Sequence, residues 1–149
     1  MEALAAYLHF VAMLLTGACL LAEAWILDPD IQPPQVRLLA RIDLYYLLAA
    51  VAALATGLLR LAVSAKGAGF FLSNPVLYIK LALFVAVGLT SIVPTLRILR
   101  WNRALRDGRF QVMRGSEIAA TRQLILVEVA LFAGIPLAAV LMARGIGHA

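Results

Sequence analysis

Four long apolar runs constrain this chain more than any other feature of its sequence. They cover about residues 4–27, 41–63, 75–97 and 118–143. A helix of roughly 20 apolar residues is long enough to cross about 30 Å of hydrocarbon. Because backbone polar groups in lipid must be satisfied within the protein, each run predicts a transmembrane helix. Hydrophobic residues make up 64% of the 149 positions and charged residues only 14%, which is typical of a membrane protein.

The connections between these runs are short and contain residues that end or begin helices. The first connection, DPDIQPPQ, holds three prolines, and the third run follows SNP, where Ser73 or Asn74 can cap a helix that Pro75 begins. Sequential helices with short connections pack antiparallel by default. We therefore expect an all-α fold in which residues 1–149 form a single transmembrane four-helix bundle. The first run lacks the positive residues that precede the apolar core of a signal peptide, so we expect it to remain in the mature protein.

The distribution of basic residues predicts the orientation of the bundle. The third connection, RILRWNRALRDGRFQVMRG, is rich in arginine, and short loops of this kind stay cytoplasmic, which places both termini outside. The formal net charge is +5, but the basic residues flank apolar runs and form no basic face with interleaved aromatic residues. This pattern excludes nucleic acid and favours contact with anionic membrane lipids. Cys19 is the single cysteine, so no intramolecular disulfide or cysteine metal cluster can form.

Three basic side chains fall at one depth in the outer half of the predicted bundle. His9 and Lys80 each lie about 8 Å inside the outer end of their helix, and Arg60 lies at or just above that depth. An ionisable group at the membrane centre costs about 2.5 to 3.5 kcal/mol on insertion scales, so each of these groups needs a partner. The only acidic residue expected nearby is Glu2. Uncompensated positive charge at low dielectric constant favours an anionic ligand.

An imidazole beside two cations has the chemistry to hold an iron porphyrin. Histidine ligates iron in its neutral form, and basic side chains pair with the propionates. In this hypothesis His9 is the metal ligand, while Lys80 and Arg60 bind the carboxylates. Two simpler interpretations stay open: Lys80 and Arg60 snorkel to the headgroups, and His9 is a hydrogen-bonded histidine without a metal. Small residues on the second helix would let a neighbouring backbone or a flat ligand approach closely: Ala49, Ala53 and Gly57.

A second polar layer lies nearer the cytoplasmic end and carries charges of both signs. Its members are Glu23, Arg41, Asp43, Arg97 and Arg122. Alternating signs predict a network of ion pairs that fixes the register of the helices. Glu128 lies deeper, and its carboxyl group is expected to be protonated unless an arginine reaches it, so that it can relay protons. The sequence holds no nucleophile triad, phosphate loop or His/Cys metal spacing, which argues against hydrolases, nucleotide enzymes and zinc chemistry.

The chain resembles, over nearly its whole length, a bacterial membrane protein family known as domain of unknown function 2214. The stretches that carry this resemblance are YLHFVAMLLTGACLLAEAWIL, ARIDLYY and NPVLYIKLALFVAVGLTSIVPTLRILRW. More distantly, the early histidine and the YIKLAL segment resemble the membrane protoporphyrinogen oxidases of the HemJ kind and the CopD copper-resistance membrane domain. Resemblance to HemJ implies a bound haem b and functional roles for His9 and Lys80, with Arg60 a looser transfer. The tryptophan and glycine that usually follow the histidine in those proteins are replaced here by FVAMLLTGA.

The residues and the resemblance together predict a multi-pass protein of the bacterial inner membrane. It would bind haem b or another porphyrin between its first three helices and, if it is an enzyme, act as a HemJ-like oxidoreductase with Lys80 and Glu128 as catalytic residues. The alternative is a non-catalytic membrane module that binds lipid or a protein partner. A carrier or channel is a third interpretation, which four helices without an inverted repeat would support only as an oligomer. A homo-oligomer is left open.

Overall fold

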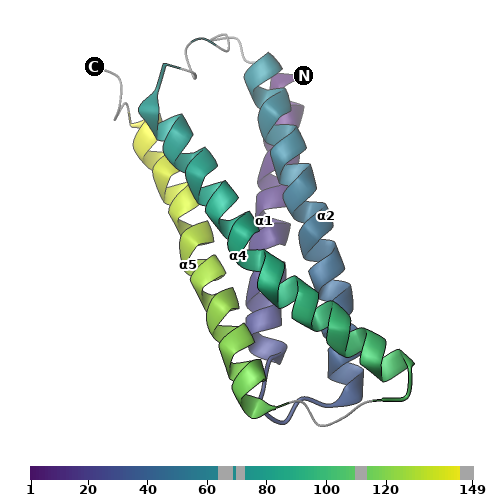
Figure 1. Ribbon diagram of the computed structural model, residues 1–149. Coiled ribbons are helices and arrows are strands. Elements are labelled where there is room, and N and C mark those ends of the chain that lie inside the picture. Colours follow the sequence, from purple (N-terminus) through teal and green to yellow (C-terminus); the bar gives the residue numbers. More distant parts are fainter. Residues whose placement is uncertain (64–68, 70–72, 110–113, 145–149) are drawn as a thin grey trace.

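The computed structural model describes residues 1–63, 69, 73–109 and 114–144, and these residues form four long helices. The helices are α1 (Glu2–Ile26), α2 (Pro33–Val63), α4 (Pro75–Arg106) and α5 (Gly115–Ala143). They run alternately in opposite directions (Figure 1). Each is long and apolar enough to cross a membrane. The predicted all-α architecture of four antiparallel helices, each a candidate membrane span, is therefore confirmed.

Two helices are longer than their apolar runs. α2 begins at Pro33 rather than near residue 41. The backbone N–H groups of a helix's first turn have no carbonyl partner within the helix, so proline, which lacks an N–H, is accepted there. α4 begins as predicted, with the Asn74 side chain accepting a 2.8 Å hydrogen bond from the Val76 amide. It continues to Arg106, since arginine is a good helix former. Gly108 then adopts the left-handed backbone conformation, with φ at 67°, which ends the helix.

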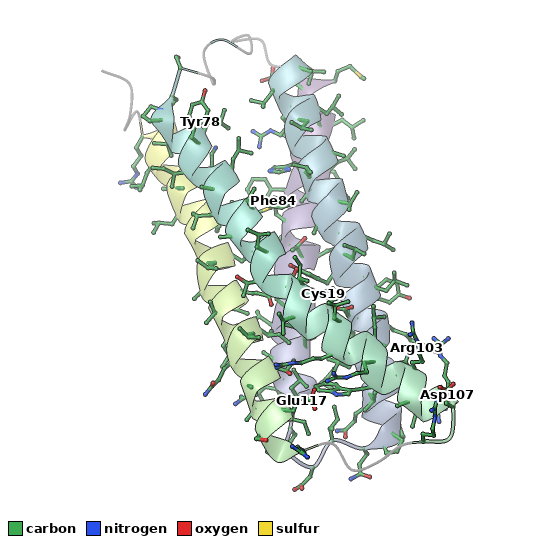
Figure 2. The ribbon with its side chains drawn as sticks, in the orientation of Figure 1. Cys19, Tyr78, Phe84, Arg103, Asp107 and Glu117 are labelled. Carbon is green, nitrogen blue, oxygen red and sulfur yellow. The ribbon has the colours of Figure 1, made fainter. Side chains whose placement is uncertain are left out.

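The two ends of the bundle differ in composition. We call the end with Glu2, Val63 and Pro75 the termini end, and the opposite end, with Ile26, Pro33 and Arg106, the arginine end. Figure 2 shows Arg103, Asp107 and Glu117 at the arginine end, whereas Tyr78 lies toward the termini end. The charged side chains therefore gather mainly at one end of an otherwise apolar bundle.

The helices pair as two hairpins. α1 packs most extensively on α2, and α4 on α5, while the contacts between α2 and α4 and between α1 and α5 are fewer. α4 runs beside α5 near the termini end and crosses toward α2 near the arginine end (Figure 1). The hydrophobic core follows this geometry and gathers in the half near the arginine end, with Leu20, Leu39, Ile98, Trp101 and Ile125 among its members. The half near the termini end is less completely filled.

Large apolar side chains cover the outside of the bundle. Phe10 and Leu89, for example, are 66% and 64% exposed. A soluble monomer rarely presents a continuous apolar surface of this size, because burying it away from water is favourable. The surface therefore agrees with four helices that face lipid.

Candidate functional site

A cavity of about 190 Å³ lies between the hairpins in the half near the termini end. Its lining includes His9 from α1, Arg60 from α2 and Lys80 from α4, together with Glu2. The three basic residues that the sequence assigns to one layer thus lie around one space. Their roles as metal ligand, cofactor-binding residues and catalytic residue stay predictions.

α2 fixes the orientation of the His9 ring. Nδ1 of His9 lies 3.0 Å from the carbonyl oxygen of Ala53 and 3.2 Å from the hydroxyl of Thr56. A carbonyl oxygen only accepts, so Nδ1 carries the proton and donates. The Thr56 hydroxyl donates its own proton to the Ala52 carbonyl at 2.6 Å and can therefore accept from His9. Nε2 of a neutral imidazole keeps its lone pair, which is how metal-ligating histidines are commonly held.

Gly57 makes this close approach of α1 and α2 possible. A Cβ atom at position 57 would lie 3.2 Å from Cε1 of His9, which is tighter than ordinary van der Waals contact. Ala53, directly along the same face, is 2% exposed and supplies the carbonyl that accepts from His9. The small residues predicted on this helix thus accommodate a side chain of the neighbouring helix.

The two cationic side chains reach the cavity from different helices. Lys80 is half-buried one and a half turns into α4, where Leu77 and Phe84 also line the cavity. Arg60 is exposed in the last turn of α2 and lies close enough to His9 and Lys80 to repel positive charge on either. Like charges converging on one cavity, with Glu2 as the acid on its lining, favour an anionic occupant.

A second cavity, of about 380 Å³, lies nearer the middle of the bundle. It shares Leu54 and Phe84 with the first cavity, so these two side chains separate the spaces. Its lining is mainly apolar but carries four hydroxyl groups, those of Thr16, Tyr46, Ser91 and Thr95. The bundle therefore contains two neighbouring cavities of different polarity, one in the half near the termini end and one nearer its middle.

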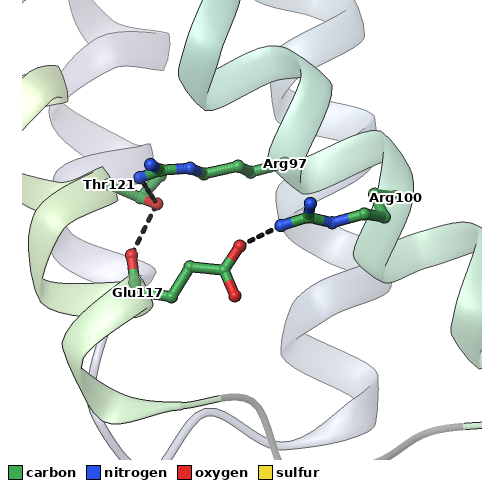
Figure 3. A network of polar contacts seen from close by, with 4 residues as sticks. All are labelled: Arg97, Arg100, Glu117 and Thr121. Atoms are coloured by element: carbon green, nitrogen blue, oxygen red, sulfur yellow. Dashed lines mark hydrogen bonds and ion pairs between the residues drawn. The ribbon is translucent and has the colours of Figure 1, made fainter.

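The predicted ion-pair network of the second polar layer is wrong. Among the described residues, ion pairs join Arg100 to Glu117 and Arg109 to Asp107, and both lie at the arginine end. Figure 3 shows that Arg97 instead donates to the Thr121 hydroxyl, at 3.0 Å, and that Thr121 donates to the Glu117 carbonyl.

The remaining arginines of that layer, Arg41 and Arg122, form no ion pair in the part of the chain that the structure describes. Nε of Arg122 donates to the carbonyl oxygen of Ala24 at 3.1 Å, and Arg41 is exposed. Long cationic side chains of this kind keep their charged heads near the polar boundary while their stems cover apolar surface. The acidic members are consequently left inside the bundle without a cationic partner among the described residues.

Glu23, Asp43 and Glu128, which we call the carboxyl cluster, are 2%, 4% and 1% exposed. They come from α1, α2 and α5. Glu128 lines neither cavity, so the predicted catalytic pair of Lys80 and Glu128 is divided between two places. Sequence reasoning missed the grouping because it began α2 near residue 41, which placed Asp43 at the membrane surface. The start at Pro33 places Asp43 about 15 Å along the helix.

Comparisons with known proteins identify a family whose description names no activity. No curated protein and no solved structure matches the chain, so the resemblance to HemJ and CopD gains no support from them. A family model described as a predicted membrane protein, DUF2214, matches residues 1–147. The match spans both cavities and the carboxyl cluster. With its four candidate spans, the chain therefore belongs to the DUF2214 family of predicted membrane proteins.

Proposed function

We propose that this protein binds haem b, or a related porphyrin, in the cavity lined by His9, Arg60 and Lys80 and uses it for redox chemistry in the bacterial inner membrane. The observation that supports this most directly is the orientation of His9. Its Nδ1 donates to the Ala53 carbonyl, which leaves Nε2 as the ligating atom on a cavity shared with two cationic side chains.

The donor set fits a haem. Nε2 of His9 would ligate the iron, and Arg60 and Lys80 would bind the propionates through charge-assisted hydrogen bonds. Bound haem would supply one-electron chemistry. The protein's own residues would orient the group by holding its carboxylates toward the termini end, and the surrounding leucines would exclude water.

The volume of the cavity limits how a porphyrin can bind. The cavity of about 190 Å³ is smaller than the roughly 300 to 1,000 Å³ of typical cofactor pockets. The second cavity adjoins it across Leu54 and Phe84. A macrocycle therefore needs both spaces, and the side chains of Leu54 and Phe84 must move aside to join them. Leu54 is exposed and Phe84 only half-buried, so neither is held by the packed core.

The orientation of the protein belongs to the same proposal. Short arginine-rich connections remain cytoplasmic, so the arginine end would face the cytoplasm and the His9 cavity would lie in the outer half of the membrane. Membrane lipids with anionic headgroups would surround the arginine end.

A visible spectrum tests the haem proposal. The protein is expressed with ample haem supply, purified in detergent and compared with His9→Ala and with His148→Ala, which removes the other histidine of the chain. We expect a Soret band in the wild type and in His148→Ala, and its loss or large shift in His9→Ala. A wild-type protein without a Soret band, or a band unchanged in His9→Ala, would contradict the proposal.

A further inference from the structure

The carboxyl cluster is unusual because three acidic side chains from three helices meet inside the bundle. Glu23 lies near enough to Asp43 and Glu128 for their charges to interact, and all three are more than nine-tenths buried. Glu23 and Glu128 each have an oxygen, Oε1 in both, with no hydrogen-bond partner among the described residues. Buried polar atoms are nearly always paired, so these two oxygens indicate a ligand or a proton that the protein atoms alone do not account for.

The hydrogen bonds that the cluster does make come from hydroxyl groups. Thr95 of α4 donates to Oδ1 of Asp43 at 2.7 Å. The Tyr46 hydroxyl lies beside the Glu128 carboxyl group and also beside Ser91. Both Thr95 and Tyr46 line the second cavity. Two members of the cluster are therefore each one hydroxyl group away from a cavity.

In the described part of the chain, no cation near the cluster is positioned to balance three negative charges. The titratable groups that face it are Cys19 on α1 and Tyr46 on α2, and α4 contributes the hydroxyls of Thr95 and Ser91. On α4 and α5, Arg97 and Arg122 donate to Thr121 and to the Ala24 carbonyl instead. Several carboxylates close together in a dry interior cannot all be ionised, because both desolvation and mutual repulsion oppose it. The cluster must therefore carry protons or a bound cation.

Protons explain the arrangement better than a metal ion. Among the described residues, no group of three His, Cys, Asp or Glu side chains is arranged to hold a metal ion. A protonated carboxyl group needs no such convergence, since it is neutral and can itself donate a hydrogen bond.

We propose that Glu23, Asp43 and Glu128 form an intramembrane proton-binding site that exchanges protons with water in the second cavity through Thr95 and Tyr46. In the exchange step one carboxyl O–H bond breaks and its proton passes to the hydroxyl oxygen of Thr95 or Tyr46, which releases its own proton to water, so that the water becomes hydronium. The carboxylate left behind accepts hydrogen bonds from its hydroxyl partner and from a neighbouring neutral carboxyl group. This inference does not depend on haem binding and uses neither His9, Arg60 nor Lys80, although a bound macrocycle would displace water from part of the second cavity.

Infrared spectroscopy of the whole protein in lipid vesicles tests this site directly. Protonated carboxylic acids have a C=O stretching band that carboxylates and glutamine amides lack, and the band shifts when the acidic proton is replaced by deuterium. In the wild type at neutral pH we expect this band, and we expect it to shift in D₂O and to weaken as pH rises. Glu23→Gln and Glu128→Gln should each lose part of it, and the double variant most of it.

The matched control is Glu117→Gln, which removes an ion-paired carboxylate at the arginine end and should leave the band unchanged. Absence of the band in the wild type, or a band equally strong in the double variant, would overturn the proposal. So would a band that does not shift in D₂O in the folded protein. A band that disappears when Na⁺ or Ca²⁺ is added at constant pH would assign the cluster to a metal cation instead. The wild-type measurements decide the matter even if a variant does not fold.

Discussion

The polar groups inside this bundle depend on very few hydrogen bonds, so single side chains should have large effects. Asp43 is 4% exposed and receives a 2.7 Å hydrogen bond from Thr95. His9 is held by one carbonyl and one hydroxyl group. In lipid, water does not replace a lost partner, and an unsatisfied buried group retains its full desolvation penalty.

Thr95→Val removes the donor to Asp43 while keeping the shape of the side chain. We expect it to destabilise the protein by about 1 to 3 kcal/mol, because Asp43 is left with an unsatisfied oxygen. The control is Thr90→Val, whose hydroxyl bonds only the Ala86 carbonyl of its own helix and should matter little. Thermal unfolding in detergent compares the two variants. Equal melting temperatures would show that the bond to Asp43 contributes nothing.

Lys80→Met distinguishes a ligand-binding lysine from one that only snorkels. If Lys80 binds a propionate, the substitution removes a charge-assisted hydrogen bond worth about 1.5 to 3 kcal/mol, so haem affinity should fall at least about tenfold. Lys80→Arg keeps the positive charge and should retain most of the affinity. Haem titration followed by absorbance gives both values. Unchanged affinity in Lys80→Met, together with slightly higher stability, would favour the snorkelling interpretation.

At the scale of helices, the close contact between α1 and α2 depends on Gly57, which has no side chain. Gly57→Ala would place a Cβ atom 3.2 Å from the His9 ring, which would have to shift by a few tenths of an ångström while it is held by the Ala53 carbonyl. We expect a net destabilisation of about 1 kcal/mol or more and weaker haem binding, because overpacking outweighs the gain in helix propensity.

Gly88→Ala is the matched control on α4. A Cβ atom at position 88 meets nothing within 4 Å, so the substitution should be neutral or stabilise the helix by about 0.5 to 1 kcal/mol. Melting temperatures of the two variants in one detergent make the comparison. If both alanines raise the melting temperature equally, the ring of His9 is not confined as the structure indicates.

The helices were easier to predict than the contacts between their side chains. The length of each apolar run identified the four long helices of the described residues, because crossing lipid requires a continuous span of fixed length. The ends of α2 and α4 were missed, since prolines and arginines at helix ends look like loop residues in a hydropathy pattern. Counting residues from the predicted helix ends correctly put His9 and Lys80 in one layer. The same counting separated Asp43 from Glu128, because an error in the start of a helix shifts the depth of every residue after it.

At the scale of the whole molecule, the half of the bundle near the arginine end differs from the half near the termini end. The arginine end has the packed core and the ion pairs, whereas the half near the termini has the cavity lined by His9, Arg60 and Lys80. The carboxyl cluster lies inside the bundle, between the basic cavity and the ion pairs. If the arginine end is cytoplasmic, the basic cavity opens toward the outer side of the membrane, and the cluster lies on the inner side of that cavity.

Cysteine labelling in intact cells tests this orientation. Cys19→Ser removes the single native cysteine, and a new cysteine is then introduced either at Asp107, at the arginine end, or at Ser73, at the termini end. A membrane-impermeant maleimide should label Ser73→Cys in intact cells and Asp107→Cys only after the cells are opened, because short arginine-rich connections are retained in the cytoplasm. The reverse labelling pattern would show that the arginine end faces outward. Haem would then have to enter the basic cavity from the cytoplasm, and the carboxyl cluster would lie on the outer side of that cavity.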